Sequence, residues 1–459
     1  MDDLSIPVHY PKLRAVDVRP YQHNGEPYYL LEDPLELNGG ALLVPQGMGP
    51  ILALCDGSKA DAAAINAALI RRYGYGVGAS AIEELLAALD HSFLLENERF
   101  ERAAGHKLDA FRQSSHRPPI LAGLSYPADP DELAHLLDGY MGQPYVEQTR
   151  EEQEWATDLT DSTDQNGFGP KEICEHPSDR RHSLSIPADS HDPDVPIQSG
   201  RGIFSPHIDY PRGGPIYGGV WQASADLVQA ADLVVMFATD HYGHDRFTLT
   251  RQRYATPYGV LPTDDGVVAR LAQAMGPRAA FAGEMRHMRE HSVELVAVWL
   301  HHLRRENPPA LVPILTGGLH DFFHGEAQPD QDATISRVLD TLAEIGRARR
   351  VLVVASGDMS HVGPAFGGRP LTPTGEKRLR LADQDLLGHL QEGDGDGFFR
   401  AIARVGDRNN VCGLTPFYLG LRLMQRIQGS QARGRLTGYG RCPADDTNTS
   451  AVTICGMIY

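Results

Sequence analysis

The sequence of 459 residues predicts an α/β protein, in which a layered α/β domain over residues 119–459 follows a small α+β unit over residues 13–110. Apolar runs of strand length, such as 233–238 and 351–355, show no polar alternation, which is typical of strands buried on both faces. Segments with helical periodicity alternate with these runs. Hydrophobic residues make up 41% of the chain, which is enough for a large packed core, and the length favours two domains.

Charge and cysteine content limit the classes of partner and compartment. The net charge of −18 argues against a nucleic-acid partner, because a phosphate backbone repels an acidic surface. The five cysteines form no C-x-x-C pair, which favours a reducing compartment over a disulfide framework. Met1-Asp2-Asp3-Leu4 lacks the start of a signal peptide, and the apolar runs are too short to span a membrane. We therefore expect a soluble cytoplasmic protein that binds no membrane.

In the first unit, we expect two strands at 28–31 and 41–45. Three helices are then expected, at 49–54, 60–73 and 79–89. Phe93–Leu95 followed by Glu96–Phe100 indicates a strand, a tight turn and a returning strand. Helix, helix and wing in this order predict a winged helix.

The segment 51–58, taken with 85–95, resembles the PqqD-like domains. This resemblance implies that the unit binds a peptide or a partner protein. Two other interpretations are a DNA-binding winged helix and a structural cap. The second helix carries only Lys59 and Arg71-Arg72 as strong positive charges, which is few for reading a DNA groove.

Between the two units, residues 101–118 are polar and are expected to form a linker. Asp129 or Asp131 can cap the helix that follows. From 147 to 200 polar residues replace apolar ones, which predicts a flexible acidic insertion. Its histidines and cysteine lack regular spacing and are interpreted as loop residues rather than as a metal site: His176, His182, His191 and Cys174.

The rest of the chain alternates strands with helices. We expect strands at 202–204, 233–238, 310–315, 351–355 and 450–457. We expect helices at 266–275, 291–304, 333–345, 376–392, 395–405 and 412–427. Polar residues that follow the strands of such a sheet meet at one edge and form its functional site.

Four histidine-bearing turns are the candidates for that site. His207, His241 and His361 follow strand-like segments, whereas His291 opens a helix. In Ser205–Gly214, His207 precedes a glycine-rich segment that is expected to form a turn. Imidazole suits zinc, copper and iron. A structural role also remains open, because the chain has 20 histidines and most single histidines bind no metal.

Cys412 lies at a loop-to-helix junction, where the helix N-terminus is expected to lower the pKa of its thiol. A thiolate would shift the metal preference toward softer ions. The other interpretation is that Cys412 is a small buried hydrophobe. Asp240 and Asp358 can equally be helix caps or turn residues.

At these motifs the chain resembles the Memo-like family, the protein B of the AmmeMemoRadiSam system, from about Ile120 to Tyr459. The motifs that carry the resemblance are Ala122–Pro127, Pro206-His207-Ile208-Asp209-Tyr210, Asp240-His241, Glu290-His291-Ser292-Val293-Glu294, Asp358-Met359-Ser360-His361 and Val411-Cys412-Gly413. The resemblance implies a central mixed sheet of the class III extradiol dioxygenase (LigB-like) type. The related dioxygenases hold ferrous iron with two histidines and a carboxylate.

Carried over residue by residue, the resemblance implies that His207, His241 and Cys412 bind a transition metal ion, iron or copper rather than zinc. It implies that His361 lines the same pocket. His291, Glu294 and Asp358 would be supporting or acid/base groups. Ile208-Asp209 and Asp240 depart from the family's small residues, and Asp209 is a possible further ligand.

The function expected from the resemblance is that of a metal-dependent oxidoreductase or dioxygenase-like enzyme, in which His361 or His291 moves protons. Its expected partners are a radical-SAM protein and an AMMECR1-like protein, with a peptide or protein at the N-terminal unit. One alternative is a non-catalytic module that delivers iron or copper to a partner. Another is a zinc-dependent hydrolase.

Overall fold

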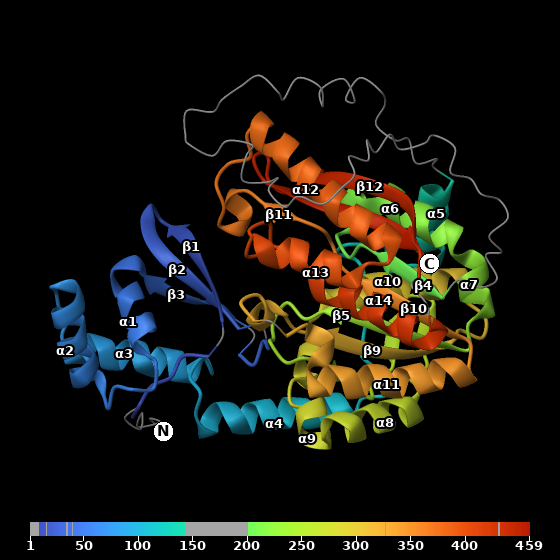
Figure 1. Cartoon of the computed structure of the whole chain (residues 1–459). Helices are drawn as coiled ribbons and strands as arrows, with labels where there is room; N and C mark the ends of the chain where they lie inside the picture. The colour runs from blue at the N-terminus through green and yellow to red at the C-terminus, as the bar shows by residue number, and fades with distance from the viewer. Residues whose placement is uncertain are drawn as a thin grey trace.

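The computed structural model describes residues 9–142 and 201–459, apart from residues 15, 34, 39, 326, 430 and 431 (Figure 1). The acidic insertion expected at 147–200 lies outside the described residues. Within the described ranges, no helix is both long and apolar enough to cross a membrane.

The main sheet of the described chain has eight strands and mixed direction. In spatial order they are β11 (His361–Val362), β13 (Ala451–Ile458), β4 (Gly202–Ser205), β10 (Val351–Ser356), β5 (Leu233–Thr239), β9 (Ala310–Thr316) and β6 (Thr248–Leu249), and β12 (Arg435–Pro443) pairs with β13. β4, β10, β5 and β9 run parallel to one another, whereas β13 and β6 are antiparallel to their neighbours in this set. The predicted layered α/β domain with a central mixed sheet is confirmed.

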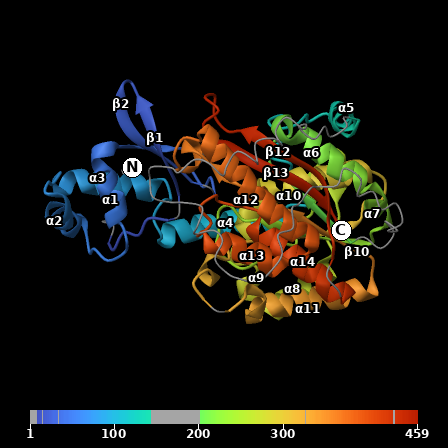
Figure 2. The same cartoon turned by 45° about the horizontal axis from the view of Figure 1, so that its top comes forward.

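Helices cover both faces of this sheet. One buried cluster includes residues of α8 (Asp265–Met275), α11 (Ala333–Ala348), α12 (Pro373–Glu392), α13 (Gly395–Arg404) and α14 (Leu414–Gln428), of which α12, α13 and α14 lie side by side in both views (Figure 1, Figure 2). The cluster on the other face includes residues of α5 (Pro130–Met141), α6 (Tyr210–Ala223), α7 (Ala225–Ala230) and α10 (His291–Leu303). Along β5, Val235 and Phe237 belong to the first cluster and Val234 and Met236 to the second. Both faces of the strand are therefore buried, which explains why its sequence is apolar throughout.

The glycine-rich segment after His207 is helical, so the turn expected there is wrong. α6 already begins at Tyr210. An added Cβ would lie 2.2 Å from the Tyr140 ring at Gly214 and 2.2 Å from the Tyr140 carbonyl oxygen at Gly218. These glycines allow α5 to approach α6 closely, a tertiary requirement that their local sequence does not reveal.

The N-terminal unit has its own sheet and its own buried cluster. The antiparallel strands β1 (Asp17–His23), β2 (Glu26–Glu32) and β3 (Leu42–Pro45) precede α1 (Gly49–Leu54), α2 (Ala62–Tyr73) and α3 (Ala79–His91). The strands expected at 28–31 and 41–45 and all three helices are confirmed.

The prediction of two strands after the third helix is wrong. Leu95 makes only an isolated bridge with Leu13, and α4 (Glu98–Gln113) begins where a returning strand was expected. The side chain of Asn97 caps α4 by accepting a hydrogen bond from the Phe100 N–H. No wing therefore follows these helices, and most of the expected linker at 101–118 is the helix α4, which leads to the main domain (Figure 1).

The N-terminal unit contacts the main domain at the 3-10 turn Glu284–Met288 and at the residue after it. Arg112 of α4 forms an ion pair with Glu284 at 2.7 Å, and Glu36 pairs with Arg289 at 2.5 Å. Lys107 of α4 donates hydrogen bonds to the carbonyl oxygens of residues 35 and 36. The unit is thereby attached directly before Glu290, which belongs to the site described below.

We predict that Gly218→Ala destabilises the protein by about 1–3 kcal/mol, because the new methyl group meets the backbone of Tyr140 rather than a flexible side chain. Gly388→Ala in α12 is the matched control, since a Cβ there meets nothing within 4 Å. The control is expected to raise stability by up to about 1 kcal/mol. Denaturant unfolding of both variants measures the difference, and equal midpoints would contradict the close α5–α6 packing.

Candidate metal centre

Three parallel strands of the main sheet end at the same level. Ser356 of β10 is in register with Ser205 of β4 and with Ala238 of β5. Two or three residues beyond each of these positions, the chain carries His207, Asp358 and His241. The strand register therefore brings together three of the side chains that the sequence nominated.

His207 is 2% exposed and is held from two sides. Its backbone N–H donates to Asp358 Oδ1 at 2.8 Å, and its Nδ1 lies 3.2 Å from Ser356 Oγ. The Ser356 hydroxyl donates its hydrogen to the carbonyl oxygen of Ser292 at 2.6 Å, so it accepts from His207 Nδ1–H. Nε2 of His207 then carries a lone pair, and it lies 3.3 Å from Cys412 Sγ.

Cys412 is brought to His207 by close backbone packing before α14. The N–H of Gly413 donates to the Asp358 carbonyl at 2.8 Å, and a Cβ on Gly357 would lie 2.5 Å from Gly413 Cα. The N–H of Asp358 donates to Cys412 Sγ at 3.2 Å. Burial raises the pKa of the thiol, although hydrogen bonding to His241 acts in the opposite direction. The lowered pKa expected from the helix N-terminus is therefore wrong, because burial of the sulfur outweighs it.

The carboxylate of Glu290 is fully buried and orients His241. One oxygen lies 2.9 Å from His241 Nδ1, and the other accepts from the backbone N–H of His241 at 2.9 Å. Burial opposes a charge on His241, but Glu290 and Cys412 together raise the pKa of His241 well above its ordinary value. Burial likewise opposes the charge of Glu290, yet His241 and His291 hold the pKa of this carboxyl well below its usual range.

Among the described residues, two groups of side chains have ligand atoms within 4.8 Å of one another: His207–His241–His291 and His207–Asp358–Cys412. His207 belongs to both groups. The set expected from the sequence, His207, His241 and Cys412, therefore takes members from each. These donors are imidazoles, a thiol and one carboxylate, a composition that fits a transition metal better than magnesium or calcium.

Asp358 is the carboxylate among these candidate donors, and its pKa is raised toward neutrality. Its side chain is 3% exposed, and its Oδ2 is 3.9 Å from His207 Nε2. Burial raises the pKa of the carboxyl to about 7, although the backbone N–H of His207 favours the charged form. This geometry suits the supporting or acid/base role expected for Asp358.

His361 lies near the centre but belongs to neither donor group. Its Nδ1 lies 3.1 Å from the Asn410 carbonyl oxygen and 3.3 Å from that of Met359. Burial, followed by the charge of His241, lowers the pKa of His361 to about 4. His361 is thus neutral at pH 7, with Nδ1 engaged by carbonyl groups.

Glu294 does not face the donors. Its carboxylate binds the segment that follows α4 through hydrogen bonds. It accepts hydrogen bonds from Arg117, from the backbone N–H groups of Ile120 and Leu121, and from the hydroxyl of Tyr126. Both Arg117 and Glu294 are almost fully buried. An acid/base role for Glu294 does not fit this geometry, because both of its oxygens are already engaged.

Asp209 and Asp240, which the sequence analysis singled out, are both paired with arginines. Asp209 forms an ion pair with Arg212 at 2.5 Å and belongs to neither donor group. Asp240 pairs with Arg286 at 2.7 Å and also accepts from the Tyr242 N–H. These contacts favour the cap and turn interpretation for Asp240.

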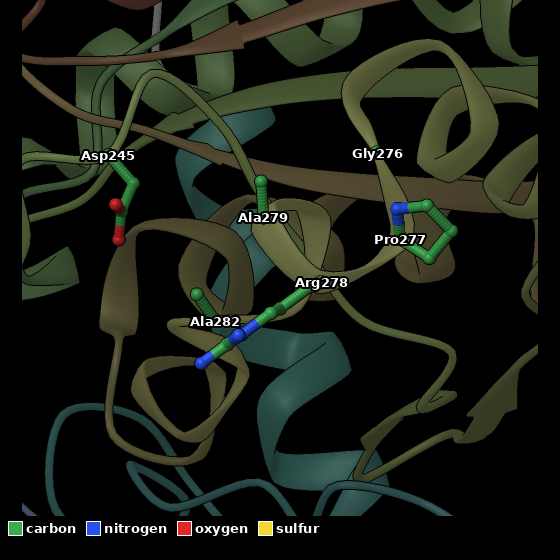
Figure 3. A pocket seen from close by; sticks show the side chains of 6 residues that line it. All are labelled: Asp245, Gly276, Pro277, Arg278, Ala279 and Ala282. Carbon is green, nitrogen blue, oxygen red and sulfur yellow. The ribbon is translucent and has the colours of Figure 1, made fainter.

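A surface pocket lies apart from these donors, and Figure 3 shows the side chains that line it. Its volume is about 600 Å³. Its lining residues are Asp245, Gly276, Pro277, Arg278, Ala279 and Ala282. Asp245 is paired with Arg286 at 2.5 Å. None of the donor residues contributes to this wall, so the pocket is not the candidate site.

Two residues of the site were missed from the sequence. In the sequence, Glu290 stands out only as part of a motif, although the residue before a predicted helix is a candidate N-cap. Ser356 carried no signal of its own, because it is the last residue of a buried strand. Its role follows only from the register that places it beside His207.

Comparison with known proteins identifies relatives over most of the chain. The sequence model described as "Memo-like protein" matches residues 175–458, a range that includes every donor. A "MEMO1 family protein" from Aquifex aeolicus (strain VF5) is 24% identical over 98% of this chain and 99% of its own length. One from Thermus thermophilus is 24% identical over 74% of this chain and 82% of its own.

A third relative, from Desulfurococcus amylolyticus, is 26% identical over 65% of this chain and 83% of its own. Among solved structures, an uncharacterized protein from Escherichia coli K12 covers 56% of this chain and 99% of its own at 13% identity. Its TM-score is 0.34, which is too low to indicate a shared fold.

We predict that Arg117→Ala destabilises the protein by about 3–5 kcal/mol, because it leaves the buried Glu294 without its charged partner. Arg350→Ala is the control, since it breaks an exposed pair with Asp232 and is expected to cost at most about 1 kcal/mol. Thermal unfolding compares the two variants. A similar small loss in both would contradict the anchoring role of Glu294.

Proposed function

This chain belongs to the Memo-like family, and from that premise we propose that it is a metal-binding protein whose transition metal ion is held by His207, His241 and Cys412. The observation that carries the proposal is that His207 Nε2 lies 3.3 Å from Cys412 Sγ. Its lone pair is available because Nδ1 is the nitrogen hydrogen-bonded to Ser356. A buried imidazole and a half-buried thiol at this distance form a pair of donors that suits iron, copper or zinc.

Iron or copper is proposed ahead of zinc because the family resemblance implies redox chemistry. When bound, such an ion would supply redox or Lewis-acid chemistry. The protein would orient the donors through Ser356 and Glu290, and Asp358 would hold or release a proton on one carboxylate oxygen. The pKa of about 7, raised by burial, leaves this carboxyl partly protonated at neutral pH.

The leading activity is that of an oxidoreductase related in fold to the class III extradiol dioxygenases. In support, the main sheet is mixed and the donors follow the carboxyl ends of its parallel strands. His361 is proposed as a second proton-transfer group, because burial lowers its pKa to about 4, so that it is neutral at pH 7 and would release readily any proton that it takes up.

A second candidate function is delivery of iron or copper to a partner. The exposure of the donors favours it, because the side chains of His241 and His291 are 29% and 33% exposed and can be reached from outside.

The N-terminal unit is proposed to bind a peptide or a partner protein, as its resemblance to PqqD-like domains implies. A radical-SAM protein and an AMMECR1-like protein are the proposed partners of the whole chain. In support, the unit has its own buried cluster, and its contact with Arg289 lies one residue before Glu290.

We predict that protein purified without oxygen contains a transition metal, and that His207→Ala and Cys412→Ala each retain at least about tenfold less of it, because each removes a donor. Cys442→Ala is the matched control, since this buried thiol donates to the Arg212 carbonyl and lies in neither donor group. Elemental analysis measures all four samples. Wild-type metal content in Cys412→Ala would remove the thiolate from the site.

We predict that iron-loaded protein consumes oxygen with a phenolic substrate, and that Asp358→Asn does so at least about 100-fold more slowly at equal iron content. The asparagine can still accept from the His207 N–H, but it cannot exchange a proton. An oxygen electrode measures the rates. Metal transfer to a partner without any oxygen consumption would contradict the enzymatic function and favour delivery.

A further inference from the structure

One buried carboxylate contacts two imidazoles of the centre. Glu290 Oε1 lies 2.9 Å from His241 Nδ1 and 3.3 Å from His291 Nδ1. The same oxygen accepts from the backbone N–H of Ser292 at 3.0 Å, which fixes the carboxylate at the start of α10. Glu290 therefore contacts both rings, and its contact with His241 is the shorter one.

This contact determines which nitrogen of each imidazole carries the proton. A carboxylate accepts hydrogen bonds, so the nitrogen facing it is the one that bears hydrogen. Nδ1 of His241 donates to Glu290, and Nδ1 of His291 lies 3.3 Å from the same carboxylate oxygen, so a proton on each Nδ1 is favoured and Nε2 of each ring remains to act as a donor atom to a cation. A carboxylate behind the distal nitrogen is the usual support of histidines that bind metals.

The third imidazole faces the same space. The ring centroids of His241 and His291 lie 4.6 Å apart, and those of His207 lie 5.0 Å from His241 and 5.4 Å from His291. The ligand atoms of all three lie within 4.8 Å of one another. Nitrogen donors to one ion, at bonds of about 2.0–2.1 Å, are at most about 4.2 Å apart, so small side-chain movements suffice to bind an ion.

We propose that His291 is a further ligand of the same metal ion, so that the centre offers three imidazoles and one thiolate, and that Glu290 is the positioning residue of both His241 and His291. The inference rests on the proposed function, because it concerns the same ion. It replaces the proton-transfer role expected for His291 from the sequence.

Four protein donors restrict which ions can react at the centre. A four-coordinate ion such as Zn²⁺ would have no position left for a substrate, whereas an ion that takes five or six ligands, such as ferrous iron, would keep one or two. With this ligand set, a four-coordinate ion could only be stored or delivered, whereas a six-coordinate ion could also take part in catalysis.

The test is titration of the full chain with Co²⁺ alone, followed by its visible d–d absorption and its near-ultraviolet thiolate-to-cobalt absorption. We expect His291→Ala to lower Co²⁺ affinity at least about tenfold and to change the d–d bands, while the thiolate absorption remains. Added imidazole is expected to restore the wild-type d–d bands. Glu290→Gln is expected to lower affinity by about 10–100-fold and to alter the same bands.

His389→Ala is the matched control, because this histidine pairs with Asp394 and belongs to neither donor group, and it is expected to leave affinity and spectrum unchanged. Wild-type Co²⁺ affinity and d–d bands in His291→Ala would overturn the inference. This holds even if Glu290→Gln shows a lower affinity and altered bands. Absence of Co²⁺ binding by the wild type, or thiolate absorption that persists in Cys412→Ala, would instead overturn the proposed function.

Discussion

The register of three parallel strands is the constraint on which the centre depends. Because Ser356 is level with both Ser205 and Ala238, the turns after β4, β10 and β5 leave the sheet at the same height. A shift of one residue in any of these strands would turn its buried side chains to the opposite face. The apolar clusters on both faces oppose such a shift, so the packing of the core also determines where His207, Asp358 and His241 lie.

Two carboxylates at the start of α10 hold different parts of the site. Glu290 holds the imidazole of His241, whereas Glu294, four residues later, holds Arg117 and the chain that follows it. Arg117 also donates to the backbone carbonyl oxygens of His287 and Glu290, so one guanidinium joins the carboxylate of Glu294 to the backbone of Glu290. The N-terminal unit meets the same turn through Glu36 and Arg289. A partner bound to that unit would therefore act at a point of the chain next to the metal centre.

Much of this arrangement was accessible from the sequence, because burial on both faces leaves an apolar run that is easy to recognise, as at 233–238 and 351–355. The histidines and Cys412 were accessible through their motifs. Features that depend on a residue far away in the sequence could not be predicted from it. The glycines of α6 are explained only by Tyr140, and the different roles of Glu290 and Glu294 only by the elements that each one faces. The pKa of Cys412 was predicted in the wrong direction because burial of the sulfur is a property of the fold.

The central claim is that a thiolate and imidazoles, all from the described strand ends and helix starts, bind one ion. X-ray absorption at the metal edge of the loaded wild-type protein tests it most directly. We expect one sulfur scatterer, at about 2.3 Å for zinc, together with the outer-shell pattern of at least two imidazoles at bonds of about 2.0–2.1 Å. A first shell made only of oxygen, without sulfur or imidazole, would contradict the claim.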